Sequence, residues 1–106
     1  MAEPQRATPF PSAAEAWRWA LLALARRAGT EPPRQPSSST VVRPCDPDDV
    51  VTVFRDLIER RIITRDHARV LRRFAWVQPT LQADNEMWDE AMTAAEPALR
   101  AKGIVQ

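Results

Sequence analysis

Cysteine and histidine each occur only once in the 106 residues, as Cys45 and His67. A single cysteine excludes a disulfide within the chain, and the pair cannot supply the four ligands of an ordinary structural zinc site. We therefore expect a reducing compartment. Cys45 precedes Asp46 at the expected start of a helix, where the helix dipole favours a thiolate, but the nearby aspartates oppose it. Because no CxxC pattern or adjacent base accompanies it, we interpret Cys45 as a linker or packing residue.

Long hydrophobic runs are also missing. The most apolar stretch, residues 20–25, falls far short of the ~20 residues needed to cross a bilayer. Its charged neighbours, Arg26 and Arg27, follow it, whereas a signal peptide carries positive charge before its apolar region. We expect a cytoplasmic protein without a membrane span, and an interfacial role for the first helix stays open.

Motifs for catalysis and cofactor binding are absent as well. The sequence has no phosphate loop, no dinucleotide fingerprint and no catalytic triad spacing. Asp46, Asp48 and Asp49 lack the glycine and the distal glutamate of a calcium loop, so helix capping explains them better. We expect no catalytic, cofactor-binding or metal-binding residues, no small-molecule substrate and no enzymatic activity.

A strong net charge is lacking, but charge is segregated along the chain. The formal charge is +1 and the pI is near 8.0. Residues 55–73 nevertheless contain seven arginines against three acids, whereas residues 84–102 contain five acids against two basic residues. Nearly every basic residue is arginine, which suits bidentate phosphate contacts but also follows from an arginine-biased genome. Any nucleic-acid footprint must therefore be local.

Proline and capping residues divide the chain into four segments. We expect a flexible arm over residues 1–11, an amphipathic helix over 12–29, a Pro/Ser-rich linker over 30–45 and a helical lobe over 46–106, together one small domain. Val41 and Val42 either anchor the linker or form a short edge strand, and we favour the anchor. The predicted fold is all-α: an N-terminal helix, a proline-rich linker and a compact three-helix lobe.

Capping signals set the helix limits. Ser12 and Glu15 form a capping box and Gly29 a stop for a helix over residues 13–28. Asp46 and Pro47 start the second helix, which runs to about residue 60. The third runs from residue 65, capped by Thr64, to about 76. The fourth runs from 86 to about 102, capped by Asp84 or Asn85. Within it, Pro97 predicts a kink near Thr93 or a break.

Helical periodicity predicts one core. The first helix presents Trp17, Leu21, Leu24 and Ala28, and both Ile62 and Ile63 reach the core from the turn between the second and third helices. We expect His67 to be a core histidine bonded to a backbone carbonyl or a carboxylate. The contiguous cluster is predicted to consist of Phe54, Leu57, Ile58, Leu71, Phe74, Trp88, Met92 and Leu99.

Tyrosine is absent, and tryptophan occurs four times. We expect Trp17, Trp76 and Trp88 in the core. Trp19 instead shares a helix face with Leu22 and Arg26, a residue mixture found in interface hot spots. One small lobe would not cover both apolar faces of the first helix, which predicts a protein partner or a homodimer at Trp19, Leu22 and Arg26.

The two helices between residues 47 and 76 resemble the helix-turn-helix arrangement in outline, because a short connection joins them and the second has a basic face. The turn departs from the usual pattern, since it lacks glycine and contains two isoleucines. The resemblance implies that Arg65 and Arg69, with Asp66, approach base edges. Contacts to phosphate are expected from Arg60, Arg61, Arg72 and Arg73.

Two functions follow as hypotheses. The first is a small DNA-binding or DNA-associated regulatory protein that uses the arginine-rich helix on duplex DNA. The second is a protein interaction module, or a small subunit of a larger assembly, that docks through its N-terminal helix. A solvated helix face with ion pairs such as Arg65 with Asp66 is the functionless alternative for the arginines.

Overall fold

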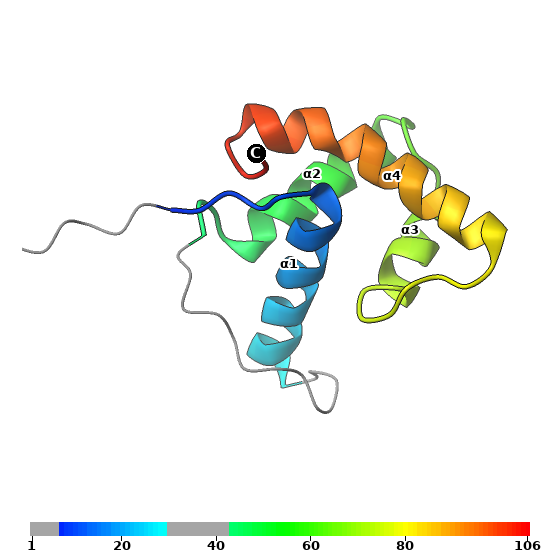
Figure 1. The fold of residues 1–106 in the computed structure, drawn as a ribbon, viewed down its shortest axis with the longest axis horizontal. Coiled ribbons are helices and arrows are strands. Elements are labelled where there is room, and N and C mark those ends of the chain that lie inside the picture. Colours follow the sequence, from blue (N-terminus) through cyan, green and yellow to red (C-terminus); the bar gives the residue numbers. More distant parts are fainter. Residues whose placement is uncertain (1–6, 30–42) are drawn as a thin grey trace, which may run out of the picture.

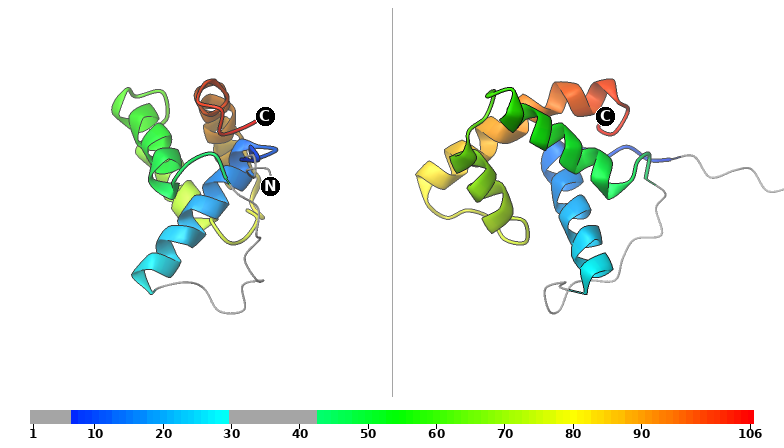
Figure 2. Two further views of the ribbon diagram at one scale, coloured as in Figure 1. Left: turned by 90° about the vertical axis from the view of Figure 1, so that its left-hand side faces the viewer. Right: turned by 180° about the vertical axis from the view of Figure 1, so that it is seen from behind.

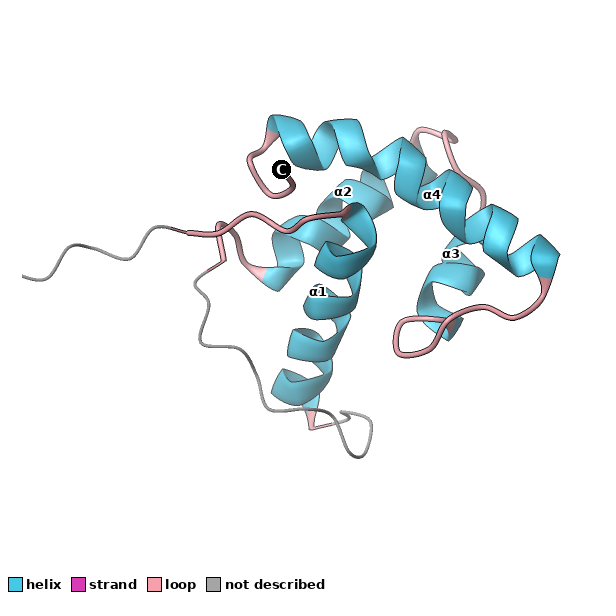
Figure 3. Cartoon of the chain, viewed as in Figure 1, coloured by secondary structure: helices cyan, strands magenta, loops and turns pink. Residues whose placement is uncertain are grey.

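Four helices form the regular structure of the chain in a computed structural model that describes residues 7–29 and 43–106 (Figure 1). They are α1 (Ala13–Ala28), α2 (Pro47–Glu59), α3 (Arg65–Arg73) and α4 (Gln82–Ala101). The described ranges contain no β-strand (Figure 3). The all-α class is therefore confirmed. Val41, Val42 and most of the predicted linker lie outside the described residues.

The first three helices begin where their capping residues predict. The Ser12 Oγ accepts a hydrogen bond from the Glu15 amide at 3.3 Å. The Asp49 carboxylate accepts one from the Asp46 amide at 2.9 Å, and Thr64 is the N-cap of α3. These side chains bond to amides that have no partner within the helix, so the sequence alone specifies the starts.

A left-handed residue ends α2 and turns the chain toward α3. Arg61 has a φ of 60°, a conformation in which glycine is usual. The Ile62 amide donates to the Leu57 carbonyl at 2.9 Å and the Arg61 amide to the Ile58 carbonyl at 3.0 Å, which is the Schellman pattern. The turn thus forms without glycine. It buries Ile63 but leaves Ile62 55% exposed, so the prediction that both isoleucines reach the core is wrong for Ile62.

The third and fourth helices differ from their predicted limits around the loop that joins them. α3 ends at Arg73, and Trp76 lies beyond it, 41% exposed, so the prediction that Trp76 is a core residue is wrong. Ala75 and Pro79 take the buried positions of this loop instead. α4 begins at Gln82, before either predicted cap, and the side-chain amide of Asn85 donates to the Leu81 carbonyl at 3.3 Å.

Pro97 does not interrupt α4, which is continuous from Gln82 to Ala101. Of the two expected outcomes, a kink near Thr93 or a break, the break is therefore wrong. Proline lacks the amide that would bond to the carbonyl of Thr93, four residues earlier. Thr93 is exposed, so water can reach that carbonyl and compensate for the missing bond.

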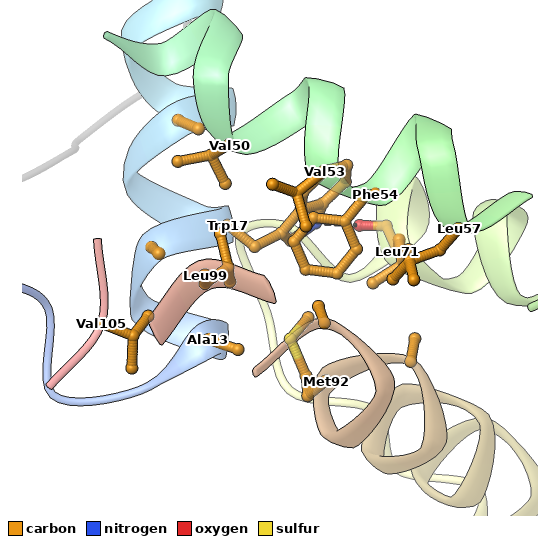
Figure 4. Close-up of a cluster of buried hydrophobic side chains, with 14 of the residues drawn as sticks. Ala13, Trp17, Val50, Val53, Phe54, Leu57, Leu71, Met92, Leu99 and Val105 are labelled. Atoms are coloured by element: carbon orange, nitrogen blue, oxygen red, sulfur yellow. Dashed lines mark hydrogen bonds between the residues drawn. The ribbon is translucent and has the colours of Figure 1, made fainter. Parts of the chain in front are cut away.

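The core lies where α1, α2 and α4 meet, with α3 attached mainly to α4 (Figure 2). Small residues on α1, Ala13, Ala16 and Ala20, are almost fully buried and let the other helices approach closely. Trp17 packs against Phe54 with ring centroids 4.6 Å apart (Figure 4). Its indole Nε1 donates to the Leu71 carbonyl at 2.8 Å, so the one polar atom of the ring is satisfied.

The predicted cluster is confirmed for seven of its eight members, and Ile58 packs against it half-buried. Its residues come from α2, α3 and α4, but α1 contributes to the same cluster. The buried members that the sequence pattern did not place there include Phe10, Val53, Ile104 and Val105.

Phe10 is buried although it lies in the segment predicted to be a flexible arm, residues 1–11. Its side chain is 1% exposed. Its amide donates to the Ile104 carbonyl at 2.8 Å, and its carbonyl accepts from the Gln106 amide at 3.0 Å. An isolated bridge between Phe10 and Val105 thereby joins the segment before α1 to the segment after α4. This contact links opposite ends of the sequence.

Candidate nucleic-acid interface

The inner side of α3 fixes the direction of its outer side. His67, Val70 and Leu71 are buried. They hold the helix against the rest of the molecule, mainly against α4 (Figure 1). Because a helix turns about 100° per residue, residues on the other side of these three must face solvent.

His67 anchors α3 at its N-terminus. The His67 Nδ1 accepts a hydrogen bond from the Thr64 amide at 3.0 Å, so histidine acts here as the second residue of a capping box. An amide can only donate, so the neutral ring carries its proton on Nε2. That nitrogen donates to Oε2 of Glu90 on α4 at 2.8 Å. The prediction of a core histidine bonded to a carboxylate is confirmed.

We expect His67→Leu to destabilise the fold by about 1 to 2 kcal/mol more than His67→Gln, as measured by urea unfolding. Glutamine is a usual partner in a capping box and keeps an acceptor for the Thr64 amide, whereas leucine leaves that amide without one. Equal losses for the two variants would show that the histidine contributes through its volume and not through the cap.

Six arginines surround the outer side of α3 and the turn before it, and all are exposed. They are the predicted nucleic-acid residues Arg60, Arg61, Arg65, Arg69, Arg72 and Arg73. Their exposure agrees with the helix phase inferred from the sequence.

Three of the six have neighbours within the chain. Arg60 pairs with Asp56 at 3.1 Å, and Arg69 pairs with Asp66 at 3.4 Å. The guanidinium of Arg73 lies 5.4 Å from the centre of the Phe74 ring. Both ion pairs are well exposed, so each contributes at most about 1 kcal/mol and can exchange for another anion.

The other three, Arg61, Arg65 and Arg72, form no ion pair with the acids of the described ranges. Asp66, which the functionless alternative assigned to Arg65, is paired with Arg69. Three exposed guanidinium groups are therefore available to an external anion on this side of the molecule.

Arg18, in contrast to the exposed arginines, packs inside the molecule. Its guanidinium lies 4.7 Å from the centre of the Trp88 ring, and burial lowers the pKa of this group from its ordinary value. Its Nε is buried without a hydrogen-bond partner in the described structure. Arg18 is thus a packing residue of α1.

The predicted protein interface on α1 is partly covered within the same chain. Trp19, Leu22 and Arg26 are all half-buried. The rings of Trp19 and Phe10 lie 5.0 Å apart, and the Arg43 guanidinium covers Phe10 at 4.1 Å. Phe10, which the sequence did not indicate as a neighbour of Trp19, therefore covers part of this side of α1. Docking at these three residues stays a prediction.

Cys45 is a half-buried thiol. Burial raises the pKa of Cys45, and the carboxylates of Asp49 and Asp46 raise it further. These effects favour the neutral thiol, as the sequence argument anticipated. Within residues 7–29 and 43–106, no cluster of potential ligands could hold a metal ion, and no helix is both long and apolar enough to span a bilayer.

Two exposed features of the molecule were not predicted from the sequence. The first is Trp76, Val77 and Leu81, which project from the loop between α3 and α4. The second is an apolar groove between α1, α2 and α3. Helix periodicity indicates which side of one helix is apolar, but a groove depends on how three helices are placed.

No protein-family model, curated protein or solved structure matches this chain.

Proposed function

We propose that this protein binds duplex DNA through α3 and the turn that precedes it, as a small DNA-associated regulatory protein without enzymatic activity. The observation that carries the proposal is the group of three exposed arginines, Arg61, Arg65 and Arg72, that have no acidic partner within residues 7–29 and 43–106. Arg65 and Arg72 lie on α3, whose opposite side is buried, and Arg61 lies in the turn before it. Arginine is suited to bidentate contacts with phosphate.

The dimensions of α3 are compatible with this function. Nine residues give a helix of about 13 Å. Its first two turns carry Arg65 and Arg69, whose side chains would reach base edges if the helix entered the major groove by its N-terminus. Arg61 and Arg72 lie before and after them and would contact phosphates.

The conformation of Arg61 adds support. A left-handed conformation is costly for residues other than glycine, by roughly 1 kcal/mol or more. Arg61 adopts this conformation at a position where glycine would cost less conformational energy. Its side chain is exposed and forms no ion pair among the described residues. A function for the guanidinium would explain that choice.

Substituting Arg65 and Arg72 together by alanine should weaken the binding of a duplex of about 20 base pairs and reduce its salt dependence. Each phosphate contact contributes about −0.9 to the slope of log K against log salt. Because Arg72 is placed on phosphate and Arg65 at a base edge, the double variant should flatten the slope by about 1 unit. Fluorescence anisotropy between about 50 and 200 mM salt measures both quantities.

The matched control is the double variant Arg100→Ala, Lys102→Ala, which removes the same charge from the end of α4. Its slope should equal that of the unmodified protein. Circular dichroism should show that both variants keep their helices, because exposed charges contribute little to stability. Equal flattening in the two variants would assign the binding to general positive charge, and no flattening in the α3 variant would likewise refute a specific role of α3.

A further inference from the structure

An apolar groove lies between the second half of α1, the outer side of α2 and the inner edge of α3. The side chains of Trp17, Phe54 and Leu71 form its floor. Leu21 and Leu24 line it from α1. Its volume is about 300 Å³, and it is open to solvent. In the right-hand view of Figure 2, α1 and α3 both extend below α2.

The groove remains open because α1 extends past its partners. The buried residues of α1 all lie in its first half; they are Ala13, Ala16, Trp17 and Ala20. Leu21 and Leu24 continue the same apolar side but are only half-buried. Val51 and Ile58 on α2 are half-buried in the same way. The surface of the groove is therefore formed by aliphatic side chains of two helices and is partly exposed. Grooves that recognise a partner helix usually have such an exposed apolar surface.

Positive charge stands at the rim of this groove. Arg55 of α2 and Arg72 of α3 line it and are exposed. Among residues 7–29 and 43–106, neither forms an ion pair with an acid. Two acids of α2 are engaged elsewhere, since Asp48 pairs with Arg27 and Asp56 with Arg60. An occupant with carboxylates beside its apolar side would complement both features of the site.

We propose that this groove binds one amphipathic helix of a partner protein, whose apolar residues enter between α1 and α3 and whose glutamates or aspartates meet Arg55 and Arg72. A volume of about 300 Å³ is at the low end for ligand sites and suits a few side chains at helical spacing. The phosphates of DNA have no favourable contact with the leucines of this floor and walls. The groove is thus a second surface, separate from the outer side of α3 except for Arg72.

The test uses two designed helical peptides of about 15 residues, a length at which an isolated helix begins to be stable. Both carry leucine at positions i, i+3, i+4 and i+7, and they differ only in having glutamate or lysine on the flanks. Fluorescence anisotropy of the labelled peptides measures their affinity for the full chain. We expect the glutamate peptide to bind with a Kd of about 1 to 100 μM and the lysine peptide at least ~10-fold more weakly.

Variants of the protein locate the binding. Leu24→Glu should weaken the glutamate peptide at least ~10-fold by placing a charge in the groove. Arg55→Glu should abolish the preference for the glutamate peptide over the lysine peptide. Lys102→Glu makes the same change in net charge at the end of α4 and should alter neither affinity. Leu24→Gln serves as the second groove variant, and unfolding curves show that each protein is folded.

Three results would overturn the proposal. The first is that neither peptide binds below about 1 mM. The second is that folded Leu24→Glu and Leu24→Gln bind as tightly as the unmodified protein. The third is a dimer of the protein alone that Leu24→Glu converts to a monomer, because a second copy would then be the occupant. DNA affinity is measured in parallel. Leu24 and Arg55 are outside the proposed DNA surface, so their substitution tests the groove independently.

Discussion

Substitution of Phe54 by alanine is expected to lower the free energy of unfolding by about 3 to 5 kcal/mol, much of the stability of a domain of this size. Phe54 is 1% exposed and lies at the centre of the cluster drawn in Figure 4. Its ring packs against Trp17, with the centroids 4.6 Å apart. Alanine would leave a cavity that α1 and α2 cannot fill without moving toward each other. Urea unfolding followed by tryptophan fluorescence measures the loss.

Trp76→Ala is the control for this prediction. It removes a larger side chain than Phe54→Ala does, but from a position that is 41% exposed beyond the end of α3. We expect it to cost less than about 1 kcal/mol, as substitutions near the surface usually do. A loss as large as that of Phe54→Ala would mean that Trp76 is buried, as the sequence pattern had indicated.

Phe10→Ala is expected to cost about 3 kcal/mol or more, although Phe10 lies in a segment that composition predicts to be a flexible arm. The ring is 1% exposed and packs beside Trp19 at 5.0 Å. It also lies under the guanidinium of Arg43 at 4.1 Å. The loss of the ring would expose the second apolar side of α1, and the emission of Trp19 should shift to longer wavelength.

Phe10→Leu is the matched variant for this position. It keeps most of the buried volume and the backbone bonds to Ile104 and Gln106, so its cost should be well below that of the alanine variant. If Phe10→Ala changed stability by less than about 0.5 kcal/mol, the segment would behave as a free arm and the packing described here would be wrong.

Local signals were sufficient to predict much of the fold. The helix limits were predicted correctly from Ser12, Asp46, Thr64 and Gly29. The first three take part in capping within a few residues of themselves, and Gly29 adopts the left-handed conformation that ends α1. The exposure of the arginines was also predicted correctly, since the phase of α3 follows from the apolar spacing of Val70 and Leu71.

Contacts between distant parts of the chain could not be predicted in this way. Phe10 is buried by residues that follow α4, almost the whole sequence away. Ile62 and Ile63 have equal hydrophobicity, and only the left-handed turn at Arg61 decides which of them faces the core. Trp76 is exposed because α3 ends three residues earlier than its apolar pattern.

The candidate site shows the same difference between what local sequence signals predict and what depends on tertiary contacts. The sequence identified the arginines and the buried His67, but the partners of these residues depend on tertiary placement. Glu90 reaches His67 from α4, and Asp66 pairs with Arg69 in place of Arg65. The apolar groove arises from three helices together, so no single helix pattern contains it.

The salt dependence of duplex binding by the unmodified protein is the most direct measurement of the central claim, that the exposed arginines around α3 contact DNA phosphates. Between three and six such contacts predict a straight line of log K against log salt with a slope of about −3 to −5. The measurement is made by anisotropy on the full chain, from about 50 to 200 mM salt. Absence of binding at the lowest salt, or a slope near zero, would contradict the claim and leave these arginines as a solvated helix face.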